Sequence, residues 1–369
     1  MNDKATESDA TDFQMRGKRG GDRALGRRRR AAIAATVVMA LIGLSSVAIA
    51  QVDVVHRASI AKLIAAYRRP SAAPSPADNP TTLAKTTLGK MLFFDPRLSG
   101  QGTISCGTCH NPSLGWQDGL SKGVGTKGGQ LGRRTPTILD SAWSQPLFWD
   151  GRAPTLEAQA KGPLAAAAEM NMPHAMVVQT VTSIPGYVSA FSAAYPSEPI
   201  TIDTVAKAIA AYERTVISAQ APFDRWIAGD NSAISESAKR GFVVFNGKAE
   251  CSSCHSGWRL TDDGFHDIGL PDADLGRGKL MPKLEILQHA FKTPTLRNCA
   301  DRAPYMHDGS LPTLETVIDH YDHGFSARAS LSPQIKPLHL SFQERADVEA
   351  FLGAMSSKDD KVTLPNLPR

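Results

Sequence analysis

Apolar residues recur at helical spacing in five segments of this 369-residue chain, whereas the alternation typical of strands is scarce. The spacing places the apolar side chains of each segment on one face of a helix with 3.6 residues per turn. This pattern predicts a mainly α-helical fold. The predicted helices cover residues 83–94, 202–216, 235–245, 314–321 and 342–355.

A different apolar run lies near the N-terminus. Residues 31–50 contain no charged side chain, and four arginines directly precede them. A run of this length is enough to span a bilayer, and basic residues mark the cytoplasmic side. The run ends in Ala48-Ile49-Ala50, a small-residue pattern that also fits signal-peptide cleavage. We therefore expect residues 1–50 to be a cytoplasmic head followed by a cleaved signal or an inner-membrane anchor, with the rest of the chain in the periplasm.

The positive charge of the chain is concentrated in this leader. Residues 1–30 hold nine Lys and Arg against five Asp and Glu, so they contribute +4 to the formal net charge of +5. The rest of the chain is nearly neutral, which gives no support to nucleic-acid binding and leaves the leader as the expected membrane contact. Four prolines between residues 70 and 80 predict a linker over residues 51–80.

Four of the five cysteines occur in two C-x-x-C-H motifs, a spacing typical of c-type haem attachment. Two thiols three positions apart can bond both vinyl groups of one porphyrin, and the next residue offers its imidazole to the iron. A redox dithiol and half of a zinc site use the same cysteine pair, but two copies, each followed by histidine, favour haem. Cys299 is expected to be a buried apolar residue. The motifs are Cys106, Cys109 and His110, and Cys251, Cys254 and His255.

An internal duplication accompanies the two motifs. Residues 135–157 and 293–315 align without a gap and share 11 identities in 23 positions. Because each copy follows one C-x-x-C-H motif, the sequence predicts two tandem cytochrome c-like haem domains. We expect them to span residues 81–220 and 221–340, with a C-terminal helix at 341–357 that returns to the first domain.

The duplication also predicts a difference between the two haems. The eighth residue after Thr155 is Pro163, and the eighth after Thr313 is Tyr321. If this position faces the far side of the iron, the second haem gains a tyrosine ligand, whereas the first haem stays open to a small ligand. A tyrosine packed in the core and a proline that ends a helix are the alternatives.

From about residue 80 to residue 355 the chain resembles the bacterial di-haem cytochrome c peroxidase family, and within it the MauG-type members. Order and spacing both match, in addition to the two haem motifs. The matching segments are 88–95 (LGKMLFFD), 148–152 (FWDGR), 169–170 (EM), 293–298 (TPTLRN) and 305–309 (YMHDG).

The resemblance implies roles for individual residues. Trp149 matches a tryptophan between the haems, Gln159 a glutamine ten positions later, and Glu169 a distal-pocket glutamate. At the position of Tyr321, peroxide-scavenging members have a methionine ligand to the second haem, and MauG-type members have tyrosine. Scavenging members also carry a histidine that closes the first haem, and residues 111–130 contain none. Both departures favour the MauG type.

Physical chemistry is consistent with these roles. A carboxyl group such as Glu169 can carry a proton between the two oxygens of peroxide, and Gln159 can position it. An anionic tyrosine oxygen lowers the potential of a haem iron. A solvated glutamate, a solvated glutamine and a core aromatic remain the alternatives for Glu169, Gln159 and Trp149. Other donors lie near Tyr321 in the sequence, and the resemblance favours Tyr321 over them. They are Met306, His307, His320 and His323.

The resemblance also implies one calcium ion between the domains, bound by an asparagine side chain and two backbone carbonyls. The carbonyls fall on Arg302 and Pro304, but Arg134 or Thr135 takes the place of the asparagine. An arginine there would repel calcium.

Three functions follow from these observations. The first is a MauG-type enzyme that uses hydrogen peroxide to oxidise a tryptophan or tyrosine of a partner protein. The second is a peroxidase that scavenges peroxide with electrons from a small cytochrome or cupredoxin, and the third is a non-enzymatic dihaem electron carrier. Tyr321 favours the first, and an open haem beside Glu169 argues against the third. MauG reaches its partner through a surface tryptophan at the position of Ala249, for which Trp258 could substitute if it does not pack on the haem.

Overall fold

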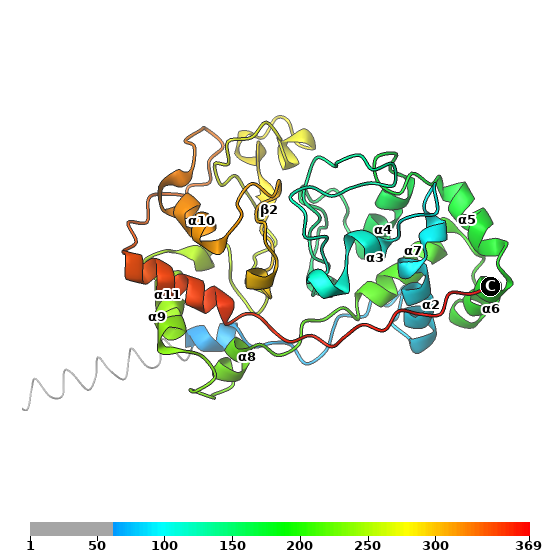
Figure 1. The fold of residues 1–369 in the computed structure, drawn as a ribbon, viewed down its shortest axis with the longest axis horizontal. Helices are drawn as coiled ribbons and strands as arrows, with labels where there is room; N and C mark the ends of the chain where they lie inside the picture. The colour runs from blue at the N-terminus through cyan, green and yellow to red at the C-terminus, as the bar shows by residue number, and fades with distance from the viewer. Residues whose placement is uncertain (1–61) are drawn as a thin grey trace, which may run out of the picture. The chain divides into compact units, whose positions relative to one another are not determined.

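The computed structural model describes residues 62–369, of which residues 66–369 form one compact unit (Figure 1). No helix in this part of the chain is both long and apolar enough to cross a membrane. The expected head, signal or anchor at residues 1–50 lies outside the described residues. Tyr67, within the expected linker, is buried against the rings of Phe223 and Phe242, so the end of that linker belongs to the folded core.

The unit is mostly helical, as predicted, with one antiparallel pair of two-residue strands that aligns Phe265 with Lys292. All five predicted segments contain a helix, and the first matches its predicted bounds. The elements are α2 (Leu83–Phe94), α3 (Cys106–Cys109), α4 (Leu156–Ala165), α5 (His174–Thr182), α6 (Pro185–Ala194), α7 (Ile202–Glu213), α8 (Pro222–Ile227), α9 (Glu236–Asn246), β1 (Phe265–His266), β2 (Phe291–Lys292), α10 (Leu314–Asp319) and α11 (Phe342–Gly353).

Hydroxyl side chains fix where the main helices begin. Each of these residues has extended backbone geometry, and its side-chain oxygen accepts a hydrogen bond from the backbone N–H of the third helical residue, which would otherwise lack a partner. Thr155 and Thr313, at equivalent places of the duplication, cap α4 and α10. The remaining caps are Thr82, Thr201, Ser235 and Ser341.

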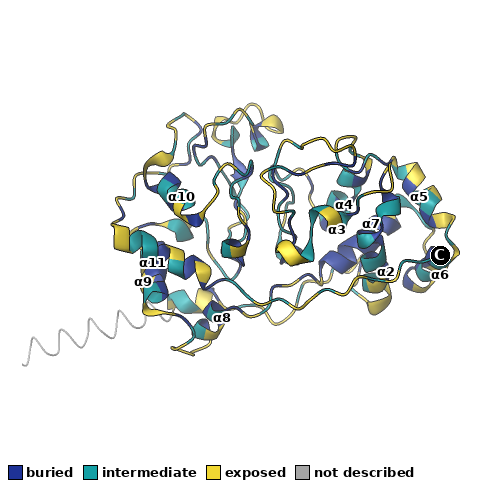
Figure 2. Ribbon diagram, in the orientation of Figure 1, coloured by how far each residue is buried: buried dark blue, intermediate teal, exposed yellow. Residues whose placement is uncertain are grey.

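Each half is organised around a pair of helices that cross at a glycine. In the first half, α2 packs on α7, which is buried along most of its length (Figure 2). A Cβ atom added to Gly89 of α2 would lie 1.9 Å from the Ala208 carbonyl oxygen of α7. In the second half, α9 packs on α11, and a Cβ atom at Gly241 would lie 1.9 Å from the Asp347 carbonyl oxygen. Close backbone approach therefore requires glycine at both crossings.

The placement of α11 corrects the expectation that the C-terminal helix joins the first domain. The helix packs on α9, where Phe351 contacts Phe242 and Phe245, and Asp347 accepts hydrogen bonds from Arg240. The tail that follows α11 does reach the first half, because the Arg369 carbonyl accepts a hydrogen bond from the Gly186 amide. The tail runs from α11 toward α6 in Figure 1.

The duplication in the sequence is also a duplication of the backbone. A short antiparallel bridge joins Leu147 to Ala153 in the first copy, and the equivalent bridge joins Tyr305 to Leu311 in the second. The 3₁₀ turns at Ser141–Trp143 and Cys299–Asp301 are likewise 158 residues apart. Residues at the same place in the two copies can therefore be compared directly, which includes Pro163 and Tyr321.

Candidate active site

Two cavities lie one in each half of the unit, and each contains one C-x-x-C-H motif. The first cavity is lined by Cys106, Cys109 and His110, at α3. The second cavity is lined by Cys251, Cys254 and His255. Each motif therefore lies at a cavity of its own.

Both motif histidines are oriented by a backbone carbonyl. The Nδ1 atom of His110 lies 3.2 Å from the Trp116 carbonyl oxygen, and that of His255 lies 2.8 Å from the Leu260 carbonyl oxygen. An Nδ1–H that donates to a carbonyl leaves the Nε2 lone pair for a metal. Burial lowers the pKa of both imidazoles, which keeps them neutral, as an iron ligand must be.

The motif cysteines do not have the properties of a redox dithiol. All five cysteines are free, and Cys299 is buried, as expected. Burial raises the pKa of Cys109 to about 11 and that of Cys251 to about 12, whereas a redox-active cysteine needs a low pKa. Half-buried thiols on a cavity wall fit thioether attachment of a haem.

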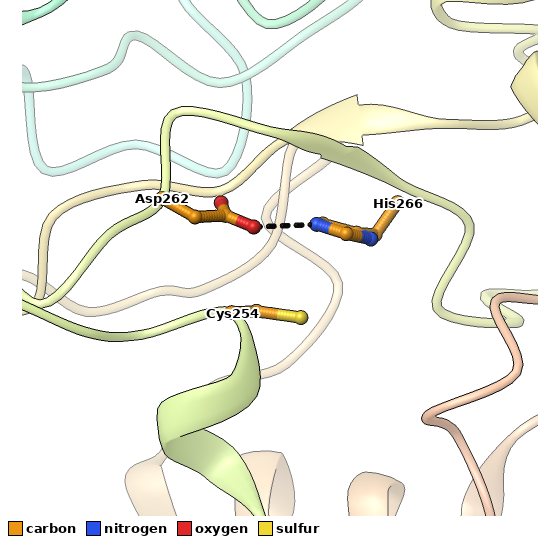
Figure 3. A group of neighbouring side chains, drawn as sticks. All are labelled: Cys254, Asp262 and His266. Atoms are coloured by element: carbon orange, nitrogen blue, oxygen red, sulfur yellow. Dashed lines mark hydrogen bonds and ion pairs between the residues drawn. The ribbon is translucent and has the colours of Figure 1, made fainter.

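One group of potential metal-binding side chains lies at the second cavity (Figure 3). The ligand atoms of Cys254, Asp262 and His266 lie within 4.8 Å of one another. Cys254 belongs to a C-x-x-C-H motif, so its sulfur is an expected attachment point of a haem. His266 Nε2 lies 2.8 Å from Asp262 Oδ2, and this bond raises the pKa of His266 to about 10. Burial opposes ionisation of Asp262, but the bond to His266 prevails and lowers its pKa to about 2. The two residues thus form a charged pair, of which His266 lines the second cavity.

Tyr321 and His255 line the same cavity. Tyr321 lies just after α10, in a π-helical turn at His320–Gly324 that the sequence pattern did not predict. Such turns are frequent at functional sites because they re-aim a side chain. Burial raises the pKa of the Tyr321 hydroxyl. The phenol therefore stays protonated at neutral pH unless a cation binds its oxygen.

The structure separates Tyr321 from two of its sequence neighbours. His320 does not line the cavity and places Nε2 2.9 Å from the Ile268 carbonyl oxygen, and the side chain of His323 is 65% exposed. Met306 and His307 do line the second cavity. The ring of His307 stacks on Phe291 with centroids 3.5 Å apart.

The first cavity brings together the expected residues of the first half. Gln159, Pro163 and Glu169 all line it with His110, and Pro163 lies inside α4. Burial raises the pKa of Glu169 against the opposing charge of Arg152. Met170 also lines this cavity and is part of the apolar core.

Trp149 is the one described residue that lines both cavities. Its indole Nε1–H donates to the Arg134 carbonyl oxygen at 2.9 Å. Its own carbonyl accepts a hydrogen bond of 2.8 Å from the Lys292 amide of the second half. Both ends of the residue are therefore fixed where the halves meet.

Sequence reasoning missed Glu213 at the C-terminal end of α7. This residue lines the first cavity and is 4% exposed, and its Oε2 atom has no hydrogen-bond partner among the described residues. Burial raises its pKa to about 8. The signal was available, because Glu213 continues the buried face of an amphipathic helix that contains Ala206 and Ile209.

The two positions considered for contact with a partner protein differ in burial. Ala249 is 5% exposed and lines the second cavity. Trp258 lies outside the walls of both cavities: its ring packs edge-on against Trp143 and lies under the guanidinium groups of Arg69 and Arg297. The structure therefore places the Trp258 ring among Trp143 and two arginine side chains.

Comparisons with known proteins match this arrangement. A family profile described as di-haem cytochrome c peroxidase matches residues 83–232, and one described as cytochrome c matches residues 238–356, which contain α11. Methylamine utilization protein MauG of Methylorubrum extorquens is 52% identical over 312 residues, which cover 84% of this chain and 88% of the relative. MauG of Methylophilus methylotrophus is 48% identical over 305 residues, which cover 82% and 91%.

A solved structure shares the fold and a substantial part of the sequence. It is the crystal structure of a MauG-like protein associated with microbial copper homeostasis. Its TM-score to this chain is 0.73 at 34% identity, and the alignment covers 79% of this chain and 95% of that one.

Proposed function

This chain belongs to the di-haem cytochrome c peroxidase family as a MauG-like, haem-dependent oxidoreductase with two covalent c-type haems, and we propose that it uses hydrogen peroxide to oxidise a partner protein. Cys106 and Cys109 would attach the first haem and Cys251 and Cys254 the second, with His110 and His255 as iron ligands. When bound, the haems supply the redox chemistry. Two electrons withdrawn from the partner, with two protons, convert one peroxide to two waters.

The observation that carries the proposal is the asymmetry between the cavities. Tyr321 lines the second cavity with His255, whereas its counterpart Pro163 lines the first cavity with His110. A tyrosine oxygen can complete the coordination of an iron, but proline has no donor side chain. We propose that Tyr321 is the distal ligand of the second haem and that peroxide enters the first cavity.

Glu169 is the proposed proton carrier of the first cavity. Reduction of peroxide requires a proton to leave one oxygen and another to reach the departing oxygen, and a carboxyl group can accept and return it. Because burial raises its pKa, Glu169 exchanges protons closer to neutral pH than a surface glutamate. Gln159 lines the same cavity, and its amide can hold the carboxyl group or a water in place.

Trp149 is the proposed electron bridge. Trp149 lines both cavities, its indole donates to the Arg134 carbonyl of the first half, and its backbone carbonyl accepts from the Lys292 amide of the second half. An aromatic ring in this position shortens the gap that an electron must cross. We also propose that the enzyme works in the periplasm, in keeping with the basic and apolar leader at residues 1–50.

A redox titration of the purified holoprotein tests the role of Tyr321. We expect Tyr321→Phe to keep both haems attached and to raise the midpoint potential of one haem, because an anionic oxygen ligand is lost. The matched control is Tyr305→Phe, which removes another tyrosine hydroxyl from the second cavity, one that donates to the Cys299 carbonyl at 3.0 Å. Equal potentials in wild type and Tyr321→Phe would contradict the assignment.

The partner is tested separately. Both MauG relatives are named for methylamine utilization, so proteins of that process are the first partners to try. Mass spectrometry should detect oxidised tryptophan or tyrosine in the partner after peroxide is added. Rapid peroxide turnover with a reduced small cytochrome or cupredoxin, and no change in any protein partner, would instead identify a scavenging peroxidase.

A further inference from the structure

We propose that the guanidinium of Arg134 replaces the divalent cation that the family resemblance places between the two haem halves, so that the junction of this protein needs no calcium. Arg134 is a positioning residue in this proposal. It joins a carbonyl of the second half to the loop that orients His110 and to the indole of Trp149. The proposal concerns this junction alone and does not depend on which partner is oxidised.

The side chain of Arg134 crosses between the halves. The residue is 5% exposed, and its Nη2 atom donates to the Arg302 carbonyl oxygen of the second half. The same atom donates to Gln117 Oε1 of the first half at 3.0 Å. The backbone amide of Arg134 adds a third bond, to the His307 carbonyl oxygen at 2.8 Å. One buried residue thus makes contacts of the kind that a shared metal ion would make.

Calcium does not fit these residues. The ion needs six to eight oxygen ligands, and the resemblance assigns one of them to the Arg302 carbonyl, which already accepts a hydrogen bond from a guanidinium. Thr135, the other residue that could stand for the missing asparagine, donates its hydroxyl to Asp118 at 2.7 Å.

The charge at this place is permanent. Burial lowers the pKa of Arg134 to about 10, helped by the nearby charge of Arg302, and the group therefore remains protonated at neutral pH. Arg302 is itself buried, and its guanidinium donates to the carbonyls of Thr295, Arg297 and Asn298. A divalent cation beside two buried guanidinium groups would be repelled at short range.

Arg134 also connects to both functional elements of the first half. Its carbonyl oxygen accepts the indole N–H of Trp149. Its guanidinium holds Gln117, which directly follows Trp116, and the Trp116 carbonyl accepts the hydrogen bond that orients His110. A change at Arg134 should therefore disturb the bridge and the first haem together, which a purely local packing defect would not do.

Metal analysis and electron paramagnetic resonance of the ferric holoprotein test the proposal. We expect less than 0.1 calcium per protein after gel filtration, and the same spectra after dialysis against a calcium chelator or against excess calcium chloride. Stoichiometric calcium, or spectra that change on chelation and recover with calcium, would overturn the proposal.

Two variants extend the test to the positioning role. Arg134→Asn removes the cation and supplies a side-chain oxygen, so we expect the spectrum of the first haem to change and calcium to bind in titration calorimetry. Arg225→Asn is the control, because it removes a half-exposed guanidinium whose nearest carboxylate oxygen, on Asp230, is 4.0 Å away. An Arg134→Asn protein with wild-type haem spectra and no calcium affinity would refute the positioning role. If that variant does not fold, Arg134→Lys, which keeps the charge, should remain insensitive to the chelator.

Discussion

At the scale of single residues, burial changes the acidity of two carboxyl groups on the wall of the first cavity. Glu169 and Glu213 come from different elements, and burial is the main cause that raises the pKa of each. A carboxylic acid without water around it keeps its proton at a pH where a surface glutamate has lost it. Carboxyl groups of this kind suit a reaction that consumes protons.

Replacement of Glu169 should affect the reaction with peroxide and not the fold. We expect Glu169→Gln to slow the reaction of the ferric holoprotein with peroxide by about 100-fold or more, because an amide cannot accept and return the proton. Stopped-flow absorbance gives the rate. Glu198→Gln, at a surface glutamate paired with Lys207, is the control and should react like wild type. A wild-type rate in Glu169→Gln would remove Glu169 from the mechanism.

Glu213 predicts a pH dependence of stability. Its pKa is about 8 in the folded protein, against 4.5 for the free group. Between these values the folded state holds a proton that the unfolded state has released, so this group makes the free energy of unfolding fall as pH rises. The slope approaches about 1.4 kcal/mol per pH unit for one group. We expect Glu213→Gln to reduce the fall of the denaturant midpoint with pH between pH 5 and about 8. The same pH dependence in wild type and variant would show that Glu213 is ionised in the folded protein.

At the scale of elements, the two helix crossings set the packing of each half. The glycine on α9 lets the backbone of α11 approach, and the pair is then fixed by Phe351 and by Asp347. Gly89 allows the same close backbone approach where α2 crosses α7. Each crossing therefore tolerates no side chain at its closest point.

A methyl group at the second crossing should destabilise the protein. In Gly241→Ala the new carbon meets the Asp347 carbonyl, so α9 and α11 must separate. We expect a loss of about 1–3 kcal/mol, read as a lower melting temperature. Gly353→Ala is the matched control, because a Cβ atom there meets no heavy atom within 4 Å. Equal melting temperatures for the two variants would show that the crossing can relax.

The same elements show what the sequence could predict. Periodic apolar residues and hydroxyl caps are local signals, and helices such as α2 and α11 were found from them with nearly correct bounds. The partner of α11 was assigned wrongly, because an apolar face does not specify which other face it will cover. The π-helical turn at Tyr321 depends on backbone hydrogen bonds and leaves no apolar period, whereas the duplication predicts Tyr321 as a candidate ligand without reference to the turn.

The candidate site was predicted best where chemistry imposes spacing. The C-x-x-C-H motifs need no fold to be recognised, and the structure brings each to a cavity. Glu213 was missed because a glutamate at the end of a helix is normally solvated, although it lies on the same helix face as Ala206 and Ile209. The hydrogen bond from Arg134 to the Arg302 carbonyl joins residues 168 positions apart, so no local sequence pattern could predict it.

At the scale of the whole molecule, the duplication has produced two cavities with different chemistry. The first offers carboxyl and amide groups, and the second offers a tyrosine. Trp149 lies against both, at a junction held by Arg134 and by the Lys292 amide. Such a division lets one cavity receive the oxidant while the other stores and passes electrons.

Electron paramagnetic resonance of the ferric holoprotein, before and after one equivalent of hydrogen peroxide, tests this division most directly. The account predicts one high-spin haem in the open first cavity and one low-spin haem in the second. Both signals should be lost when peroxide reacts with the fully ferric protein, without prior reduction. Two low-spin haems, or a ferric protein that responds to peroxide only after partial reduction, would contradict the account and indicate a distal ligand on the first haem.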